Sequence, residues 1–197
     1  MNQISSDKDW FKECLNNLNL CKKLTEIKLV ICDVDGTLTN GTMTYSATEE
    51  ASRNFSIVDG FGMVQAQKAG ILIALLSGKA HGSIAIRAKK LNIPESLCFG
   101  GQEDKIVIIK KFAQEHQLKL SEIALIGDDY FDLKTKIAEP SLLFISLQDA
   151  PFYSQAYADL VICRDGGNHA VRLFIDLVLY IQQKHFAQNL IDKALTC

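Results

Sequence analysis

Hydrophobic and polar positions divide the chain into short apolar runs and longer amphipathic segments. Six runs have the length and composition of buried strands: IKLVICD, ILIALLS, SLCFG, EIALIGD, LLFIS and DLVIC. Most are followed by a stretch with helical periodicity, such as SIAIRAKKLN, DKIVIIKKFAQEH or AVRLFIDLVLYIQQKH. Strands that alternate with helices are typical of βαβ units. The pattern therefore predicts an α/β fold, a doubly wound parallel sheet with helices on both faces.

Two segments depart from this alternation. Residues 7–24 predict one added amphipathic helix, and residues 41–56 alternate weakly and predict a small β-hairpin flap. No repeat or linker divides the rest. We expect one α/β domain over residues 27–184 without a large cap domain, a helical extension over residues 1–26 and a tail over residues 185–197.

Composition narrows the possible partners and location. Of the 197 residues, 48% are hydrophobic and 22% charged, which is typical of a globular chain, and the formal charge is only −2. We therefore expect no nucleic acid partner, and an anionic substrate would need a few local cations. No apolar run approaches the roughly 20 residues that span a bilayer, so we expect no membrane association. The lack of a signal-peptide pattern and of paired or zinc-spaced cysteines predicts a cytoplasmic protein.

Polar side chains follow several of the predicted strands. Asp33 ends the first strand, Ser77 the second, and Asp128 a later one. In open parallel sheets, ligands bind beyond the carboxyl ends of the strands. We therefore expect these three side chains to line one site.

The segment DVDGTLT contains the most specific motif. Asp33 and Asp35 are two residues apart, so in a regular strand they would point to opposite faces. A turn at Gly36 would let both carboxylates converge, and converging carboxylates repel unless a cation or shared proton offsets them. A hard ion such as Mg²⁺ would do so. A lone DxD is common on surfaces, but its place between IKLVIC and GTLT is specific.

Three further motifs are ambiguous when each is taken alone. A serine before a helix is often a cap, a lysine at a helix start is often solvated, and acidic residues suit a helix N-terminus by its dipole. The residues concerned are Ser77, Gly78 and Lys79, then Lys105, then Asp128, Asp129 and Asp132. Their order along the chain is what makes them informative.

Along the chain come first two carboxylates, then a hydroxyl, a lysine and a second carboxylate pair. This order resembles that of the haloacid dehalogenase-like phosphohydrolase superfamily, over about residues 27–183. The resemblance implies that Asp33 attacks phosphorus and that Asp35 is the general acid and base. It implies Mg²⁺ held by Asp33, the Asp35 carbonyl and Asp128. Ser77 and Lys105 would bind the phosphate oxygens. Asp129 and Asp132 would orient the metal ligands without binding the ion themselves.

Within this superfamily the chain most closely resembles the 3-deoxy-D-manno-octulosonate 8-phosphate phosphatase family. The motifs that carry the resemblance are DVDGTLTNG, NFSIVDGFGM, GGQEDK, IGDDYFDL and GGNHAVRLFIDLVL. That resemblance implies a homotetramer acting on a phosphorylated eight-carbon keto sugar acid of lipopolysaccharide synthesis. The substrate contacts it implies are Gly36, Thr37, Ser56, Ile57, Val58, Asp59, Gly60, Gly78, Lys79 and Arg87.

The chain also departs from that family's pattern. Lys79 stands in place of Arg, Arg53 in place of Lys, His169 and Asn92 in place of Gly, and Leu173 in place of Glu. A phosphatase of a nine-carbon keto acid or a broader sugar phosphatase therefore stays open. Two further alternatives are a non-catalytic tetramerisation module and a phosphotransferase that passes the phosphoryl group to an acceptor other than water.

Overall fold

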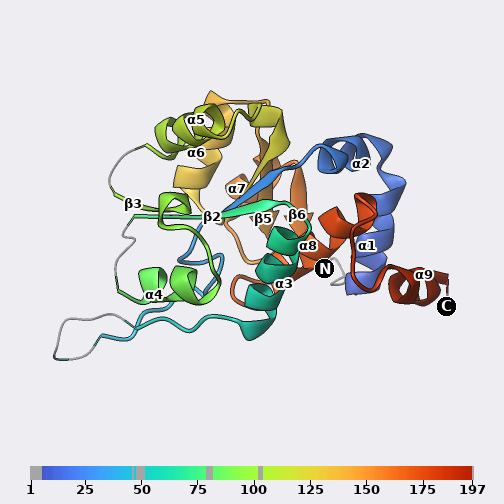
Figure 1. Ribbon diagram of the computed structural model, residues 1–197, viewed down its shortest axis with the longest axis horizontal. Helices are drawn as coiled ribbons and strands as arrows, with labels where there is room; N and C mark the ends of the chain where they lie inside the picture. The colour runs from blue at the N-terminus through green and yellow to red at the C-terminus, as the bar shows by residue number, and fades with distance from the viewer. Residues whose placement is uncertain (1–5, 46, 48–51, 79–81, 102–103, 197) are drawn as a thin grey trace.

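A six-stranded parallel sheet forms the centre of the molecule (Figure 1). The computed structural model describes residues 6–45, 47, 52–78, 82–101 and 104–196. The strand order is β3-β2-β1-β4-β5-β6. The strands are β1 (Leu29–Cys32), β2 (Leu72–Ser77), β3 (Cys98–Gly100), β4 (Ile123–Ile126), β5 (Leu143–Leu147) and β6 (Leu160–Ile162).

The strand order reverses between β1 and β4. The chain builds β1, β2 and β3 toward one edge, then returns to add β4, β5 and β6 on the other side. Leu29 pairs with Leu72 of β2 and with Ile123 of β4, so β1 lies between the two halves. Such a reversal opens a crevice beyond the carboxyl ends of the two strands. This crevice is where Asp33 and Asp128 follow β1 and β4.

Helices cover both faces of the sheet, which confirms the predicted doubly wound fold. In Figure 1, α5 and α6 lie over one face, whereas α3 and α8 lie together over the other. The helices of the α/β part are α3 (Ile57–Lys68), α4 (Ser83–Lys90), α5 (Lys105–Glu115), α6 (Tyr130–Ala138), α7 (Phe152–Tyr157) and α8 (Ala170–Ile181). Two short 3₁₀ turns, Glu95–Leu97 and Leu120–Glu122, precede β3 and β4.

The N-terminal extension folds as two helices, so the prediction of one helix was wrong. They are α1 (Asp7–Asn16) and α2 (Leu18–Thr25). Asn17 breaks the run because its side chain accepts a hydrogen bond from the Leu20 N–H and so caps α2. Trp10 is buried, and its indole N–H donates to the Val161 carbonyl at 2.7 Å. Residues 7–25 thus share the core of the α/β part.

The predicted flap is described in part. Thr44 and Ser52 pair in an antiparallel bridge, with N···O distances of 3.3 and 2.9 Å. Residues 46 and 48–51 lie outside the described residues. Between β1 and α3 the described chain contains no other sheet pairing and no helix, in agreement with the predicted absence of a large cap.

The C-terminal segment ends in helix α9 (Gln188–Thr196). Its Ile191 and Leu195 pack against the core, and the Tyr180 hydroxyl of α8 donates to Asp192 at 2.6 Å. Among the described helices, none has both the length and the apolar character needed to cross a bilayer.

Candidate active site

A cavity of about 570 Å³ lies at the carboxyl ends of β1, β2 and β4. Four of the motifs singled out in the sequence contribute to its wall. Its lining residues are Asp33, Asp35, Leu76, Ser77, Gly78, Gly101, Asp104, Lys105, Ile108, Asp128, Asp129, Phe131, Asp132 and Lys134. The fold therefore brings together the predicted nucleophile, hydroxyl, lysine and second carboxylate pair.

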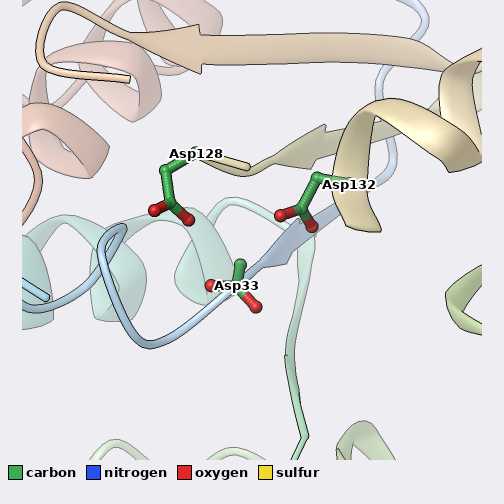
Figure 2. A group of neighbouring side chains, drawn as sticks. All are labelled: Asp33, Asp128 and Asp132. Carbon is green, nitrogen blue, oxygen red and sulfur yellow. The ribbon is translucent and has the colours of Figure 1, made fainter. Parts of the chain in front are cut away.

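Three carboxylates converge in this cavity. Asp33, Asp128 and Asp132 each place one oxygen within 4.8 Å of the others' (Figure 2). Asp33 follows β1, Asp128 follows β4, and Asp132 projects from the first turn of α6. Clustered carboxylate oxygens are the donors that a hard divalent cation prefers. The residues present therefore fit a Mg²⁺ ion, and Asp132 belongs to the same carboxylate cluster as the predicted ligands Asp33 and Asp128.

Lys105 joins two of these carboxylates. Its Nζ lies 2.6 Å from Oδ1 of Asp33 and 2.6 Å from Oδ1 of Asp132. Lys105 is the first residue of α5, which begins directly after the loop that follows β3. Its side chain is only 14% exposed. The lysine thus lies inside the cluster, and the alternative of a solvated surface lysine is excluded.

Lys105 supplies one positive charge to three carboxylates, which leaves the cluster negative when all three are ionised. Burial and the neighbouring Asp132 raise the pKa of Asp33 well above its usual range, although Lys105 opposes this. Burial and Asp132 also raise the pKa of Asp128 to about 6. Each raised pKa reports that the ionised carboxylate is disfavoured in this position. A divalent cation between these groups would offset that cost.

Two glycines allow the carboxylates to approach. Gly36 has φ +92°, and a Cβ there would collide with the carboxylate of Asp128. A Cβ on Gly127 would collide with Asp132. The predicted turn at Gly36 is therefore present, and it brings the backbone of the first motif against the second carboxylate pair.

Asp35 lies at the edge of the cavity and binds a flap residue. Arg53 Nε is 2.6 Å from Asp35 Oδ1, and Arg53 Nη2 is 3.0 Å from Asp35 Oδ2. This is a bidentate pair, the geometry that a guanidinium provides and an ammonium does not. Sequence reasoning named Arg53 only as a departure from a family pattern.

Asp129 has a structural role that the sequence left open. Its carboxylate caps α6 by accepting from the Tyr130 N–H at 2.6 Å, and it also accepts from the Tyr153 hydroxyl at 2.7 Å. Asp129 therefore links the start of α6 to α7 beside the cavity.

Most of the predicted sugar contacts lie outside the cavity wall. Asp59 is buried and accepts from the Arg172 N–H at 2.7 Å, at the start of α8. Ser56 caps α3, and its carbonyl accepts from Arg87 Nη2 at 2.7 Å. Of the others, Thr37 and Gly60 are buried, Ile57 and Val58 are exposed, and Gly36 lies against Asp128. Lys79 lies outside the described residues, and the sugar contacts stay predictions.

Several lining residues were not found from the sequence. Asp104 and Lys134 form an ion pair of 2.6 Å at the cavity mouth, and Phe131 is 68% exposed beside them. Asp104 directly precedes Lys105, and Lys134 lies two residues after Asp132, so their proximity to known motifs was the available signal. Only the fold shows that they share one wall.

This arrangement has the parts needed for phosphoryl transfer. Asp33 places a carboxylate oxygen, a group that can act as a nucleophile, in the cavity wall next to a cation and a candidate metal site. Ser77 and Lys105 line the same wall, where they can contact an anion. A second carboxylate, Asp35, lies at the edge with access to solvent, since its side chain is 31% exposed.

Comparisons with known proteins agree with this chemistry. No protein-family model matches the chain. Over 163 residues the chain is 34% identical to the 3-deoxy-D-manno-octulosonate 8-phosphate phosphatase of Haemophilus influenzae, covering 83% of this chain and 88% of that protein.

Solved structures show the same likeness. The Yersinia pestis phosphatase of that name superposes with a TM-score of 0.80 at 28% identity, covering 85% of this chain and 88% of the other. The Moraxella catarrhalis phosphatase, solved with magnesium, phosphate and KDO, has a TM-score of 0.78 at 30% identity, covering 89% of this chain and 97% of the other.

Proposed function

Because this chain belongs to the 3-deoxy-D-manno-octulosonate 8-phosphate phosphatase family, we propose that it hydrolyses this phosphorylated keto sugar acid to the free sugar acid and inorganic phosphate. The observation that carries the proposal is the contact of Asp33 with Lys105, beside Asp128, at the switch point of the sheet. The relatives supply the substrate's name, and the site supplies the reaction.

In the first half of the reaction, an Asp33 oxygen attacks phosphorus and forms an aspartyl-phosphate. The bond between phosphorus and the sugar oxygen breaks, and Asp35 gives a proton to that oxygen. In the second half, water attacks the same phosphorus, the bond to Asp33 breaks, and Asp35 takes up the water proton. Two easier displacements thus replace one difficult displacement.

The candidate metal ligands are the Asp33 and Asp128 carboxylates with the Asp35 backbone carbonyl, and Asp132 lies next to them. When bound, Mg²⁺ supplies positive charge that screens Asp33 from an anionic substrate and stabilises the transferring phosphoryl group. Lys105 holds the Asp33 side chain in place and offers an ammonium to a phosphate oxygen. Ser77 offers a hydroxyl from the same wall.

The same proposal extends to assembly and location. We expect a homotetramer in the cytoplasm, as the family resemblance implies. Large apolar side chains are exposed near the start of α3, with Ile57 at 83% and Phe61 at 44%, and an interface with another subunit would bury them. Size measurement by light scattering tests this part independently of the activity.

The proposed activity is tested by phosphate release from a panel of phosphorylated sugar acids, with and without Mg²⁺. We expect the eight-carbon keto acid phosphate to give the highest kcat/KM, and no turnover after chelation. Higher kcat/KM on a nine-carbon keto acid phosphate, or equal turnover of unrelated sugar phosphates, would overturn the substrate. Absence of turnover on every ester would favour the non-catalytic module. Transfer to an added alcohol in preference to water would identify a phosphotransferase.

A further inference from the structure

The flap carries a charged residue that reaches the active site. Arg53 follows the paired flap residue Ser52, and its side chain is only 9% exposed. A guanidinium in so buried a position needs a partner, and Asp35 provides it through two parallel hydrogen bonds of 2.6 and 3.0 Å. The pair therefore connects the flap directly to the predicted acid and base.

Arg53 also contacts two other segments of the chain. Its Nη1 lies 3.4 Å from the Ser83 hydroxyl at the start of α4, and its Nη2 lies 3.8 Å from Met43 Sδ in the first arm of the flap. The guanidinium is therefore held from several directions. Among the described residues, no other side chain donates a hydrogen bond to the Asp35 carboxylate.

We propose that Arg53 is a positioning residue that holds the Asp35 carboxylate as the base for hydrolysis of the aspartyl-phosphate. This inference rests on the proposed function. In that step a water oxygen bonds to phosphorus, the bond from phosphorus to Asp33 breaks with its electron pair returning to the Asp33 carboxylate, and the water proton passes to Asp35. The flap thus acts on the second half of the reaction through Arg53.

The geometry favours the second half over the first. A carboxylate has about four lone-pair positions, and Arg53 occupies one on each oxygen. A free position therefore remains to accept a proton from water without breaking either hydrogen bond. A leaving group that departs without a proton needs nothing from Asp35 in the first half, whereas the second half always uses Asp35 as the base. Loss of Arg53 therefore slows the second half most.

Pre-steady-state kinetics with p-nitrophenyl phosphate separate the two halves, because its leaving group departs without a proton. For Arg53→Ala we expect a burst of nitrophenolate equal to the number of active sites, followed by slow turnover. The steady kcat should fall about 10- to 100-fold, part of the range that general acid–base groups supply. KM should fall with it, and kcat/KM should stay within about threefold of the wild type.

Two further variants make the test specific. Arg53→Lys keeps the charge but not the fork, so its kcat should lie between the wild type and Arg53→Ala. Lys28→Ala removes a more exposed ion pair, 2.6 Å long with Glu122, at the opposite end of the sheet, and should match the wild type. Millimolar guanidinium should restore part of the kcat of Arg53→Ala and none of that of Asp35→Ala. Circular dichroism checks that each variant is folded.

The outcomes separate this inference from the proposed function. If the wild type shows no Mg²⁺-dependent turnover on any ester, the proposed function fails. If the wild type is active but Arg53→Ala loses kcat/KM without a burst, or is unchanged, the positioning role is overturned. Failure of added guanidinium to raise the rate of the slow phase would also contradict the positioning role. A purely structural loss is not repaired by the missing group alone.

Discussion

The ammonium of Lys105 lies 2.6 Å from the carboxylate of Asp132, which is almost fully buried. Asp132 therefore determines where Lys105 sits relative to the nucleophile. For Asp132→Asn we expect kcat/KM to fall about 10- to 100-fold and the affinity for Mg²⁺ to weaken, as is usual when a group that orients a site is lost. Turnover across a Mg²⁺ titration measures both. Asp9→Asn on the exposed face of α1 is the control, and equal behaviour of the two variants would rule out this role.

Removing the lysine leaves the carboxylates without their internal cation. Lys105→Met should destabilise the Mg²⁺-free protein by about 3–5 kcal/mol, the cost of an uncompensated buried charge. Added Mg²⁺ should restore more stability to this variant than to the wild type, because the ion replaces the missing charge among Asp33, Asp128 and Asp132. Thermal unfolding with a chelator and with Mg²⁺ measures the difference. Equal stabilisation of both proteins by Mg²⁺ would show that the ion does not replace the lysine charge, and no stabilisation of either would show that the cluster does not bind the ion.

Asp159 predicts an acid-sensitive link between the N-terminal helices and the sheet. It pairs with Lys23 of α2 at 2.8 Å and Lys136 of α6 at 2.7 Å, and it accepts from the Phe144 N–H. These contacts lower its pKa although burial opposes them. Its stabilising contribution is therefore fully present above the ordinary pKa of about 4 and is lost as the pH falls through the lower folded-state value.

Asp159→Asn should accordingly reduce the free energy of unfolding by about 1–3 kcal/mol at pH 7. The gap between variant and wild type should narrow as the pH falls below about 4. Urea unfolding at several pH values gives the comparison. If the difference in free energy of unfolding between variant and wild type does not change with pH, the ion pairs of Asp159 contribute nothing to stability.

Two departures from the family pattern fall where the backbone favours glycine. His169 has φ 66° at the start of α8, and Asn92 has φ 54° after α4. A side chain in this region costs about 1–2 kcal/mol for most residues, less for Asn, and glycine avoids that cost. His169→Gly should therefore stabilise the fold by up to about 1 kcal/mol, and Asn92→Gly by less. Glu13→Gly at an exposed position inside α1 should instead destabilise it by about 1 kcal/mol. Melting temperatures test whether the first two variants are more stable than the wild type and the third is less stable.

The sequence predicted much of this molecule because the signals were local. Apolar runs gave the strands, and the glycine in DVDGTLT predicted the turn at Gly36. The expected convergence of Asp35 on Asp33 is not seen, because Asp35 pairs with Arg53 and the carboxylates beside Asp33 are Asp128 and Asp132. The family comparisons confirm the resemblance drawn from these motifs. The break at Asn17 was missed because a single capping side chain interrupts an otherwise continuous apolar stripe.

What the sequence could not show depends on contacts between distant segments. Lys105 and Asp132 are 27 residues apart, and Arg53 and Asp35 are 18 apart, so no periodicity joins them. The family resemblance implies that Asp59 is a sugar contact, whereas its carboxylate accepts a hydrogen bond from the backbone at the start of α8. Such pairings follow from the path of the whole chain around the sheet.

We propose that Asp33 carries the phosphoryl group during turnover. The most direct measurement is to quench a reaction with ³²P-labelled substrate in acid within the first turnover, then map the labelled peptide. We expect label on the peptide that contains Asp33, formed only with Mg²⁺ and absent from Asp33→Asn. Label on another residue, or rapid turnover by Asp33→Asn, would contradict it.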